Sequence, residues 1–235
     1  MLLGVAGMVG TGKTTLSRAL ASRFGLQMAL ESVDADNPWL ESFYGGPDEM
    51  RAYALHLQLH FLATRFASMR RMRGLGGSWV LDRTWYEDAE IFARGLFEQG
   101  LMTSDEWTLY RRLYAELLYS PAARPPRLLV YLYGPIDVLL ERIATRGRPK
   151  ERDVPVEYWR ALHARYERWI TNFRHCPVLF LDVRDYDLMA DSSAIEDIAA
   201  RVRGQLEGEL PQTELWPAAA RKRRSVYHFA LPDLP

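Results

Sequence analysis

The residues best suited to chemistry lie near the N-terminus, in the segment Gly7-Met8-Val9-Gly10-Thr11-Gly12-Lys13-Thr14. This segment fits the pattern G-x-x-x-x-G-K-[ST], in which backbone N–H groups surround the phosphates of a nucleotide. Lys13 can reach the outer two phosphates, and Thr14, which Thr15 follows, can offer its hydroxyl to magnesium. The glycines allow the backbone to approach the phosphates closely, because a side chain would block it. The segment therefore predicts a binding site for a nucleoside triphosphate.

The elements that must position this loop flank it in the required order. Leu2 to Ala6 is a short apolar run typical of a buried strand, and Thr14 to Leu20 has the pattern of the helix that follows. Four more strand candidates alternate with helical patterns: Gln27 to Leu30, Trp79 to Leu81, Leu128 to Tyr133 and Val178 to Leu181. The alternation predicts an α/β fold with a parallel sheet of five strands, flanked by helices on both faces.

Three helix boundaries can be placed from their capping residues. Asn37 before Pro38 is typical of an N-cap followed by a first-turn proline. A long helix is expected from Asp48 to about Met72, ended by the glycines of residues 74–77. Thr103-Ser104-Asp105-Glu106 predicts a capping box at the start of another helix.

Charged residues follow two of the predicted strands. Ligands of parallel sheets bind beyond the carboxyl ends of the strands, and Glu31 and Asp82-Arg83 lie at such ends. The carboxylate of Glu31 can accept the proton of an attacking hydroxyl. Asp82 can help to hold magnesium, directly or through water, and Arg83 can stabilise the reacting oxygens. The structural alternatives are a solvated loop acid at position 31 and a helix cap at position 82.

Three arginines form a candidate lid. Arg142 and Arg146 are four residues apart, so they share a helix face, and Gly147 supplies a turn that directs Arg148 to the same site. Phosphoryl transfer needs positive charge around the transferred group, and the planar fork of arginine suits phosphate oxygens. A solvated basic helix face is the alternative.

Polar residues interrupt the apolar stripe of the long helix. Gln58, Phe61, Leu62 and Arg65 occupy positions i, i+3, i+4 and i+7. A buried guanidinium needs an anionic partner, which Asp88 can provide, and Gln58 can then present its amide to the edge of a base. A structural core network is the alternative.

The composition of the chain excludes some classes of protein function. The 235 residues suit one large domain, and 30 basic residues balance 30 acidic ones, which argues against a nucleic-acid or anionic-membrane partner. Cys176 stands alone, so no internal disulfide is possible. We find no apolar run of about 18 residues, and the first strand starts at once, leaving no room for a signal peptide. We therefore expect a cytoplasmic protein that acts on small molecules.

Together these segments resemble the deoxyribonucleoside kinase family, most closely its bacterial deoxyadenosine/deoxyguanosine kinase branch. The resemblance spans roughly residues 2 to 190 and rests on the following marks: the phosphate loop, Glu31-Ser32-Val33, Asn37-Pro38-Trp39-Leu40 with Phe43-Tyr44, Gln58 to Arg65, Asp82-Arg83-Thr84 with Tyr86 and Asp88, the arginine lid, and Leu181-Asp182. Ser32 stands where many members have proline, and Lys150 where some have a second acid. The tail after Leu206 has no counterpart in the family.

The resemblance also implies roles for individual residues. Glu31 would be the base at the 5′-hydroxyl, Arg83 would hold Glu31 and the phosphoryl group, and Asp82 would serve magnesium. The implied acceptor contacts are Gln58, Arg65 and Asp88 to the base, and Tyr44 and Glu151 to the sugar 3′-hydroxyl; Arg184, Asp185 and Tyr186 would lie near the adenine of the donor. We expect a P-loop kinase domain over residues 1–208, with a lid at about 142–154, and a C-terminal tail of unknown role at 209–235.

The sequence thus predicts an ATP-dependent, Mg²⁺-requiring kinase that phosphorylates the 5′-hydroxyl of a deoxyribonucleoside. Purine preference rests on the resemblance, which also implies a homodimer. Gln58 can pair bidentately with adenine, whereas Arg65 and Asp88 can meet guanine or cytosine, so deoxycytidine remains an alternative acceptor. Two more hypotheses stay open, a thymidylate-type nucleoside monophosphate kinase and a nucleotide-binding switch.

Overall fold

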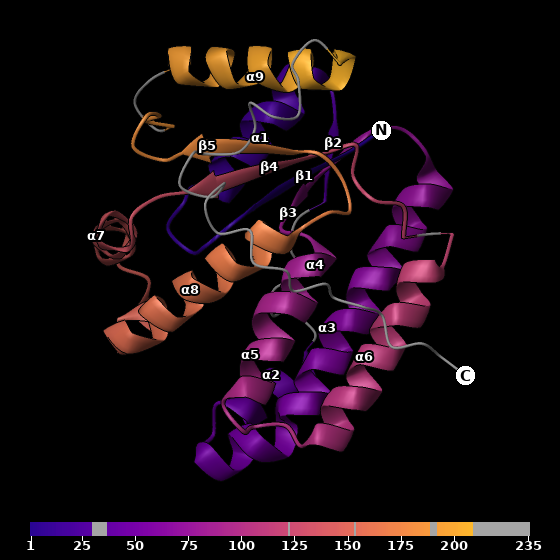
Figure 1. Cartoon of the computed structure of the whole chain (residues 1–235), viewed down its shortest axis with the longest axis vertical. Helices are drawn as coiled ribbons and strands as arrows, with labels where there is room; N and C mark the ends of the chain where they lie inside the picture. The colour runs from indigo at the N-terminus through magenta and orange to yellow at the C-terminus, as the bar shows by residue number, and fades with distance from the viewer. Residues whose placement is uncertain (30–36, 122, 153, 189–191, 209–235) are drawn as a thin grey trace. The chain divides into compact units, whose positions relative to one another are not determined.

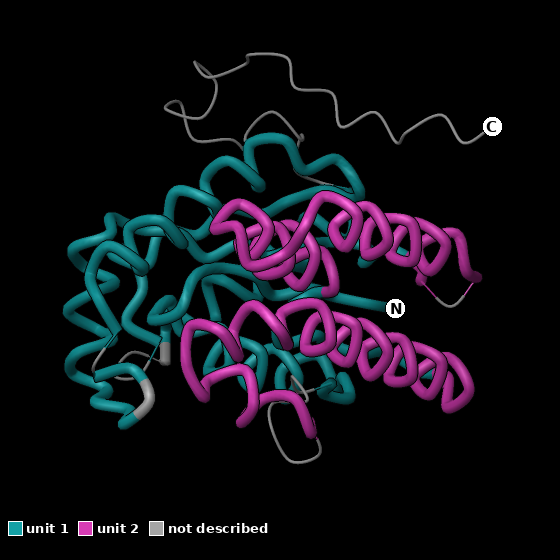
Figure 2. The backbone as a smooth tube through the Cα atoms, turned by 90° about the horizontal axis from the view of Figure 1, so that it is seen from below, with its two compact units in different colours: residues 1–30, 77–84, 125–226 teal, residues 31–76, 85–124, 227–235 magenta. Residues whose placement is uncertain are grey.

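The computed structural model describes residues 1–29, 37–121, 123–152, 154–188 and 192–208 (Figure 1). The chain divides into two compact units, which Figure 2 shows in different colours. Unit 1 takes the described parts of residues 1–30, 77–84 and 125–226, and unit 2 takes those of 31–76 and 85–124. The phosphate loop and the arginine lid therefore belong to unit 1, and the long helix belongs to unit 2.

Unit 1 contains the parallel five-stranded sheet that the sequence predicts, and the structure gives the strand order, β2-β3-β1-β4-β5. Its strands are β1 (Leu2–Gly7), β2 (Gln27–Ala29), β3 (Trp79–Asp82), β4 (Leu128–Tyr133) and β5 (Val178–Asp182). The central strand β1 pairs with β3 on one side and β4 on the other, with Leu3 opposite Val80 and Leu128. The carboxyl end of β1, where the phosphate loop begins, therefore lies between the ends of two neighbouring strands.

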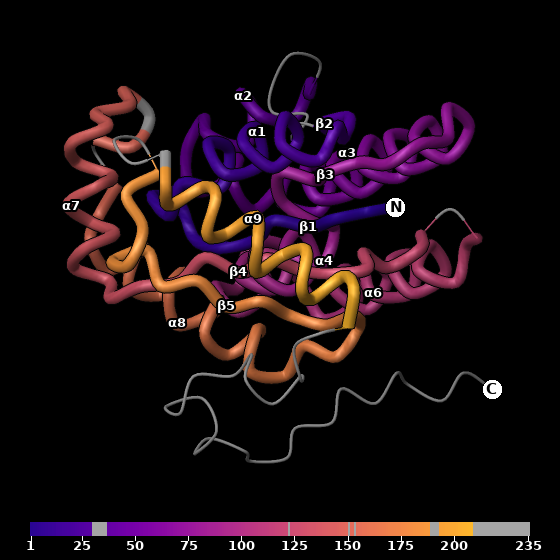
Figure 3. Tube along the Cα trace, turned by 90° about the horizontal axis from the view of Figure 1, so that it is seen from above, coloured from indigo at the N-terminus to yellow at the C-terminus, as the bar shows by residue number. Residues whose placement is uncertain are grey.

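Helices cover both faces of this sheet. On one face lie α1 (Lys13–Phe24) and α9 (Ser192–Glu207), and Figure 3 shows α9 running above the strands. On the other face lies α8 (Val156–Asn172), whose Trp169 packs edge-on against Tyr131 of β4, at 6.2 Å between ring centroids. Cover on both faces explains why every residue of β5 is buried. The helix α7 (Ile136–Arg146) and the 3₁₀ turn η2 (Pro149–Glu151) complete unit 1.

Unit 2 is helical in the part that the structure describes. Its elements are α2 (Pro38–Phe43), α3 (Pro47–Leu75), α4 (Trp85–Glu87), the π-helix η1 (Asp88–Ala93), α5 (Arg94–Glu98) and α6 (Ser104–Tyr119). The long helix α3 packs against α2, η1 and α6. Its buried residues, such as Leu62 and Phe66, recur at helical spacing, so one stripe of α3 forms the core of the unit.

The predicted caps are confirmed. The side chain of Asn37 accepts a 3.0 Å hydrogen bond from the N–H of Trp39 at the start of α2. At the start of α6, Thr103 and Glu106 form both hydrogen bonds of a capping box. The π-helix, in contrast, was not predicted. Its six residues follow α4 without a break, and wide turns of this kind are often found at functional sites.

No helix among the described residues is both long enough and apolar enough to cross a membrane.

Candidate active site

The phosphate loop of unit 1 has the backbone that its glycines predict. Gly10 and Gly12 adopt positive φ angles of 87° and 90°, a region that strongly favours glycine. Gly7 is required by its neighbour in the sheet, because a Cβ at this position would lie 2.4 Å from the carbonyl oxygen of Leu132 in β4. The loop then leads directly into the N-terminus of α1, where the first-turn N–H groups and the helix dipole favour an anion.

Two polar side chains are folded into this loop. The ammonium group of Lys13 donates a 2.9 Å hydrogen bond to the carbonyl oxygen of Met8, and the hydroxyl of Thr11 donates to the same oxygen at 2.8 Å. Lys13 is 9% exposed. The positive charge is therefore held within the loop, at the place where the motif requires a group that reaches the outer phosphates.

A hydroxyl and a carboxylate meet beside the loop. The hydroxyl of Thr14, on the first turn of α1, donates a 2.6 Å hydrogen bond to Oδ2 of Asp82 at the end of β3. Asp82 is buried. Both are hard oxygen donors of the kind that Mg²⁺ prefers, so this pair fits a magnesium site. Among the described residues no three His, Cys, Asp or Glu side chains form a metal cluster.

Arg83 has a strained backbone. Its φ of 74° is the one positive value of a non-glycine residue within the described ranges, and its N–H donates a 3.0 Å hydrogen bond to the carbonyl oxygen of Val5. A left-handed conformation of such a residue costs about 1–3 kcal/mol and tends to occur at functional sites. The strain therefore supports a functional role for the position directly after Asp82.

The sequence reasoning missed two residues of α8 that lie near Arg83. Burial raises the pKa of the Tyr158 phenol, and the positive charges of Arg165 and Arg83 partly offset this rise. Both guanidinium groups are therefore close enough to act on the same phenol. Arg165 is itself buried, which is uncommon for arginine. The only sequence signal was the seven-residue spacing of Tyr158 and Arg165, which places them on one face of a helix.

The predicted lid residues lie at the end of α7 and in the turn after it. Arg142 donates a 2.8 Å hydrogen bond to the carbonyl oxygen of Val183, just beyond β5. Arg146 donates to both carboxylate oxygens of Glu151 at 2.7 Å, whereas Arg148, with 63% of its side chain exposed, is 4.0 Å from the same carboxylate. Gly147, with a φ of 62°, makes the predicted turn.

An ion pair marks the end of β5. The guanidinium of Arg184 donates to both oxygens of Asp182, at 3.0 and 2.7 Å, and the backbone N–H of Arg184 adds a 2.9 Å hydrogen bond. These hydrogen bonds from Arg184 lower the pKa of the Asp182 carboxyl, although its burial opposes them. Asp182 therefore stays ionised, and it holds Arg184 at the carboxyl end of the sheet.

In unit 2, Arg65 and Asp88 form the pair that the sequence predicts. The Nε of Arg65 lies 2.8 Å from Oδ2 of Asp88, and Nη2 lies 3.3 Å from Oδ1, so the guanidinium and the carboxylate meet as two forks. Only 14% and 9% of their side chains are exposed. Asp88 is the first residue of the π-helix η1. The pairing fixes the orientation of the guanidinium and of the carboxylate. Groups held in this way can form hydrogen bonds to a planar base.

Gln58 lies two helical turns before Arg65 on α3 and is 4% exposed. Its Oε1 has no hydrogen-bond partner among the described residues. Since buried polar atoms are nearly always hydrogen-bonded, this oxygen is an acceptor that a bound ligand can use. The Oε1 of Gln58 could therefore accept a hydrogen bond from a base.

The predicted roles of Tyr44 and Glu31 stay predictions. Tyr44 caps the C-terminus of α2 and is 71% exposed, with its ring edge-on to Phe43. Glu31, the predicted base, lies outside the described residues. Its role stays a prediction that rests on its place in the sequence after β2.

Comparison with known proteins places these features in a family. A family model described as deoxynucleoside kinase matches residues 3–207. The chain belongs to the deoxynucleoside kinase family. It is therefore an enzyme that phosphorylates deoxynucleosides, which confirms the resemblance inferred from the sequence and the general reaction.

The relatives of this chain are named for different deoxynucleoside substrates. The chain is 40% identical over 201 residues to the deoxyadenosine/deoxycytidine kinase of Bacillus subtilis, covering 86% of this chain and 91% of that one. It is 33% identical over 216 residues to the deoxyguanosine kinase of Lactobacillus acidophilus, covering 88% and 92%. A structure of the deoxyadenosine kinase of M. mycoides with bound dATP shares the fold, with a TM-score of 0.71, 24% identity and coverage of 86% and 99%.

Proposed function

We propose that this deoxynucleoside kinase transfers the γ-phosphoryl group of ATP to the 5′-hydroxyl of a purine deoxynucleoside. The observation that carries the proposal is the phosphate loop, with Lys13 held inside it and Thr14 bonded to Asp82. These groups would bind the triphosphate, and the acceptor would be a deoxynucleoside, as the family indicates. The catalytic domain would comprise residues 1–208, with a lid at about 142–154. The cytoplasm is the proposed compartment.

In this reaction the 5′-oxygen attacks the γ-phosphorus while the bond from phosphorus to the β,γ-bridging oxygen breaks. The proton of the 5′-hydroxyl passes to a base, for which we propose Glu31. Positive charge from Lys13, Arg83 and the lid arginines would stabilise the oxygens of the transferred group, as phosphoryl transfer requires. The strained backbone of Arg83 supports its place among them.

Magnesium is the proposed cofactor, and Thr14 and Asp82 would hold it. When bound, the ion would supply positive charge that neutralises the charge developing on the phosphate oxygens. The hydroxyl of Thr14 donates to Asp82, so the two oxygen ligands already lie next to each other.

For the acceptor base we propose Gln58, Arg65 and Asp88. The Oε1 of Gln58, which has no hydrogen-bond partner in the described part of the chain, can accept from an exocyclic amino group, while the NH₂ of Gln58 donates to a ring nitrogen. Adenine presents this donor and acceptor pair, which supports deoxyadenosine as an acceptor. Tyr44 and Glu151 are proposed for the sugar 3′-hydroxyl. The ion pair of Glu151 with Arg146 would also link the sugar contact to the lid.

Deoxycytidine is the second candidate acceptor, because the amide of Gln58 also matches the amino group and ring nitrogen of cytosine. The Bacillus subtilis relative is named for both deoxyadenosine and deoxycytidine. A thymidylate-type kinase would instead have to bind a phosphate on its acceptor, and membership of the deoxynucleoside kinase family argues against it.

The test is a competition assay in which ATP and Mg²⁺ are fixed and all four deoxynucleosides compete, with dTMP assayed separately. We expect deoxyadenosine or deoxyguanosine to have the highest kcat/KM, with a deoxynucleoside 5′-monophosphate as product. Purines as the two poorest acceptors would overturn the purine proposal. Phosphorylation of dTMP with none of the nucleosides would overturn the proposed reaction.

A homodimer is also proposed. The helix α6 exposes Leu109 and Leu113 at 48% and 41%, and these residues are four apart, so they form one apolar stripe. A second copy of the chain would cover this stripe, as in isologous dimers, where the same patch meets itself.

A further inference from the structure

The segment that follows β5, residues 183–188 and here called the β5 loop, lies against the phosphate loop. A Cβ placed on Gly12 would be 3.0 Å from Cδ1 of Leu188, so the leucine side chain rests on the loop that binds phosphates. At the other end, a Cβ on Gly134 would be 2.6 Å from Cγ2 of Val183. The β5 loop is thus in contact with the carboxyl edge of the sheet at both of its ends.

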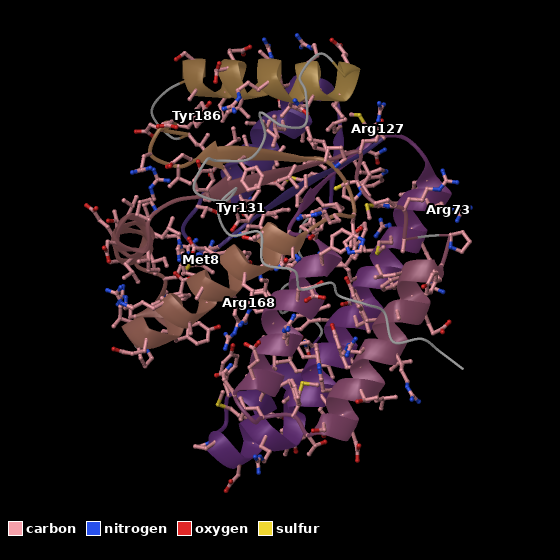
Figure 4. All side chains as sticks on the ribbon, in the orientation of Figure 1. Met8, Arg73, Arg127, Tyr131, Arg168 and Tyr186 are labelled. Carbon is pink, nitrogen blue, oxygen red and sulfur yellow. The ribbon has the colours of Figure 1, made fainter. Side chains whose placement is uncertain are left out.

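The middle of the β5 loop is tied to α9. The hydroxyl of Tyr186 donates a 2.9 Å hydrogen bond to Oδ2 of Asp197, and Nη1 of Arg201 donates to the same hydroxyl at 2.5 Å. Asp197 and Arg201 are four residues apart, on one face of α9. Figure 4 labels Tyr186 next to this helix.

The helix α9 is in turn fixed to the helix that carries the phosphate loop. It packs against α1, and Arg23 near the end of α1 forms an ion pair with Glu196. One connected set of contacts therefore runs from the phosphate loop through Leu188 and Tyr186 to α9, and back to α1. The charged partners of the Tyr186 hydroxyl make its hydrogen bonds stronger than those between neutral groups.

We propose that Asp197 and Arg201 are positioning residues for the phosphate donor, acting through the hydroxyl of Tyr186. They hold the β5 loop on the phosphate loop, so that the loop forms a preorganised wall beside the bound nucleotide. This rests on the proposed function, in which ATP occupies the phosphate loop. Neither residue touches the reacting atoms, so they act on donor binding and not on the transfer step.

The experiment compares the variants Tyr186→Phe, Asp197→Ala and Asp197→Asn with the wild type. Each is assayed for kcat, for KM of ATP and of the deoxynucleoside, and for the ratio of kcat/KM with ATP to that with GTP. Glu196→Gln is the matched control, because it removes the neighbouring ion pair of α9 and leaves Asp197 and Arg201 intact. Thermal melting of every variant reports on the fold.

We expect Tyr186→Phe and Asp197→Ala to raise the KM of ATP about tenfold, the scale of one hydrogen bond to a charged group. They should also lower the ATP/GTP ratio, with kcat at saturating ATP and the KM of the deoxynucleoside near wild type. Asp197→Asn keeps an acceptor for the tyrosine, so it should restore most of the affinity, and the control should match the wild type.

Two results would overturn the proposal. One is an unchanged KM of ATP in both Tyr186→Phe and Asp197→Ala. The other is an equal rise of that KM in Glu196→Gln, which would mean that any loosening of α9 has this effect. Failure of the proposed function looks different, because the wild type itself would then show no ATP-dependent product.

Discussion

Thr14 and Asp82 are 68 positions apart in the sequence, yet the hydroxyl of one and a carboxylate oxygen of the other are 2.6 Å apart. The sheet explains this proximity. Because β1 and β3 are parallel neighbours, the loop after β1 and the last residue of β3 lie at the same edge. The pair therefore depends on strand order, which brings a hydroxyl and a carboxylate together beside the phosphate loop.

The first prediction concerns magnesium. Replacing Thr14 with Val removes the hydroxyl while keeping a β-branched shape. If Thr14 is a ligand, we expect the Mg²⁺ concentration at half-maximal rate to rise, with a loss of kcat/KM of at least roughly tenfold, as for partners around metal sites. Thr14→Ser keeps the hydroxyl and serves as the control, so its metal dependence should stay close to the wild type. Identical Mg²⁺ titrations of the Val variant and the wild type would exclude the role.

The second prediction separates the structural role of the Arg65–Asp88 pair from its role in binding. Asp88→Ala leaves a buried guanidinium without its carboxylate, so it should lower the free energy of unfolding by about 3–5 kcal/mol. Chemical denaturation measures this loss. The double variant Arg65→Met with Asp88→Leu replaces both charges by apolar groups, and it should regain most of the stability but almost no kinase activity. Substantial activity in the stable double variant would show that the pair is only structural.

The fold could be predicted from the sequence because its signals are local. Apolar runs such as Leu128–Tyr133 mark buried strands, and Thr103 with Glu106 caps α6 through hydrogen bonds only three residues apart. The π-helix beginning at Asp88 could not be predicted, because wide turns arise from packing in the folded chain and no residue pattern specifies them. The same limit applies to the strained φ of Arg83.

The candidate site was predictable where a motif or a charge requirement was present. The phosphate loop follows from its glycines, and the Arg65–Asp88 pair from the need of a buried guanidinium for an anion. The partners of the lid arginines could not be predicted, since nothing in the sequence indicates that Arg142 donates a hydrogen bond to the carbonyl oxygen of Val183. Arg165 was missed because an arginine on a helix is normally solvated.

The third prediction concerns pH. Burial raises the pKa of the Cys176 thiol from 9.0 to about 12, and the N–H of Leu129 offsets this only in part. The folded state therefore retains the thiol proton more tightly than the unfolded state. The resulting stabilisation is fully present below about pH 9 and is lost as pH rises from there through about 12.

Two measurements check this prediction. A thiol reagent at pH 8 should label the native protein far more slowly than the protein in urea, because little thiolate forms in the fold. In denaturation between pH 8 and pH 11, Cys176→Ala should lose less stability than the wild type. Equal labelling rates in the native and unfolded states would contradict the raised pKa.

The last prediction tests the proposed dimer. Replacing Leu109 and Leu113 of α6 with Glu places two charges on the exposed apolar stripe, and like charges would then face each other across an isologous contact. We expect light scattering to give the mass of a dimer for the wild type and of a monomer for the double variant. Both leucines are exposed, so circular dichroism and the melting temperature should change little. Thr108→Glu adds a charge to the same helix about 100° away from the stripe and should leave the dimer intact. A wild-type mass of one chain, or a double variant that remains dimeric, would rule out this stripe as the interface.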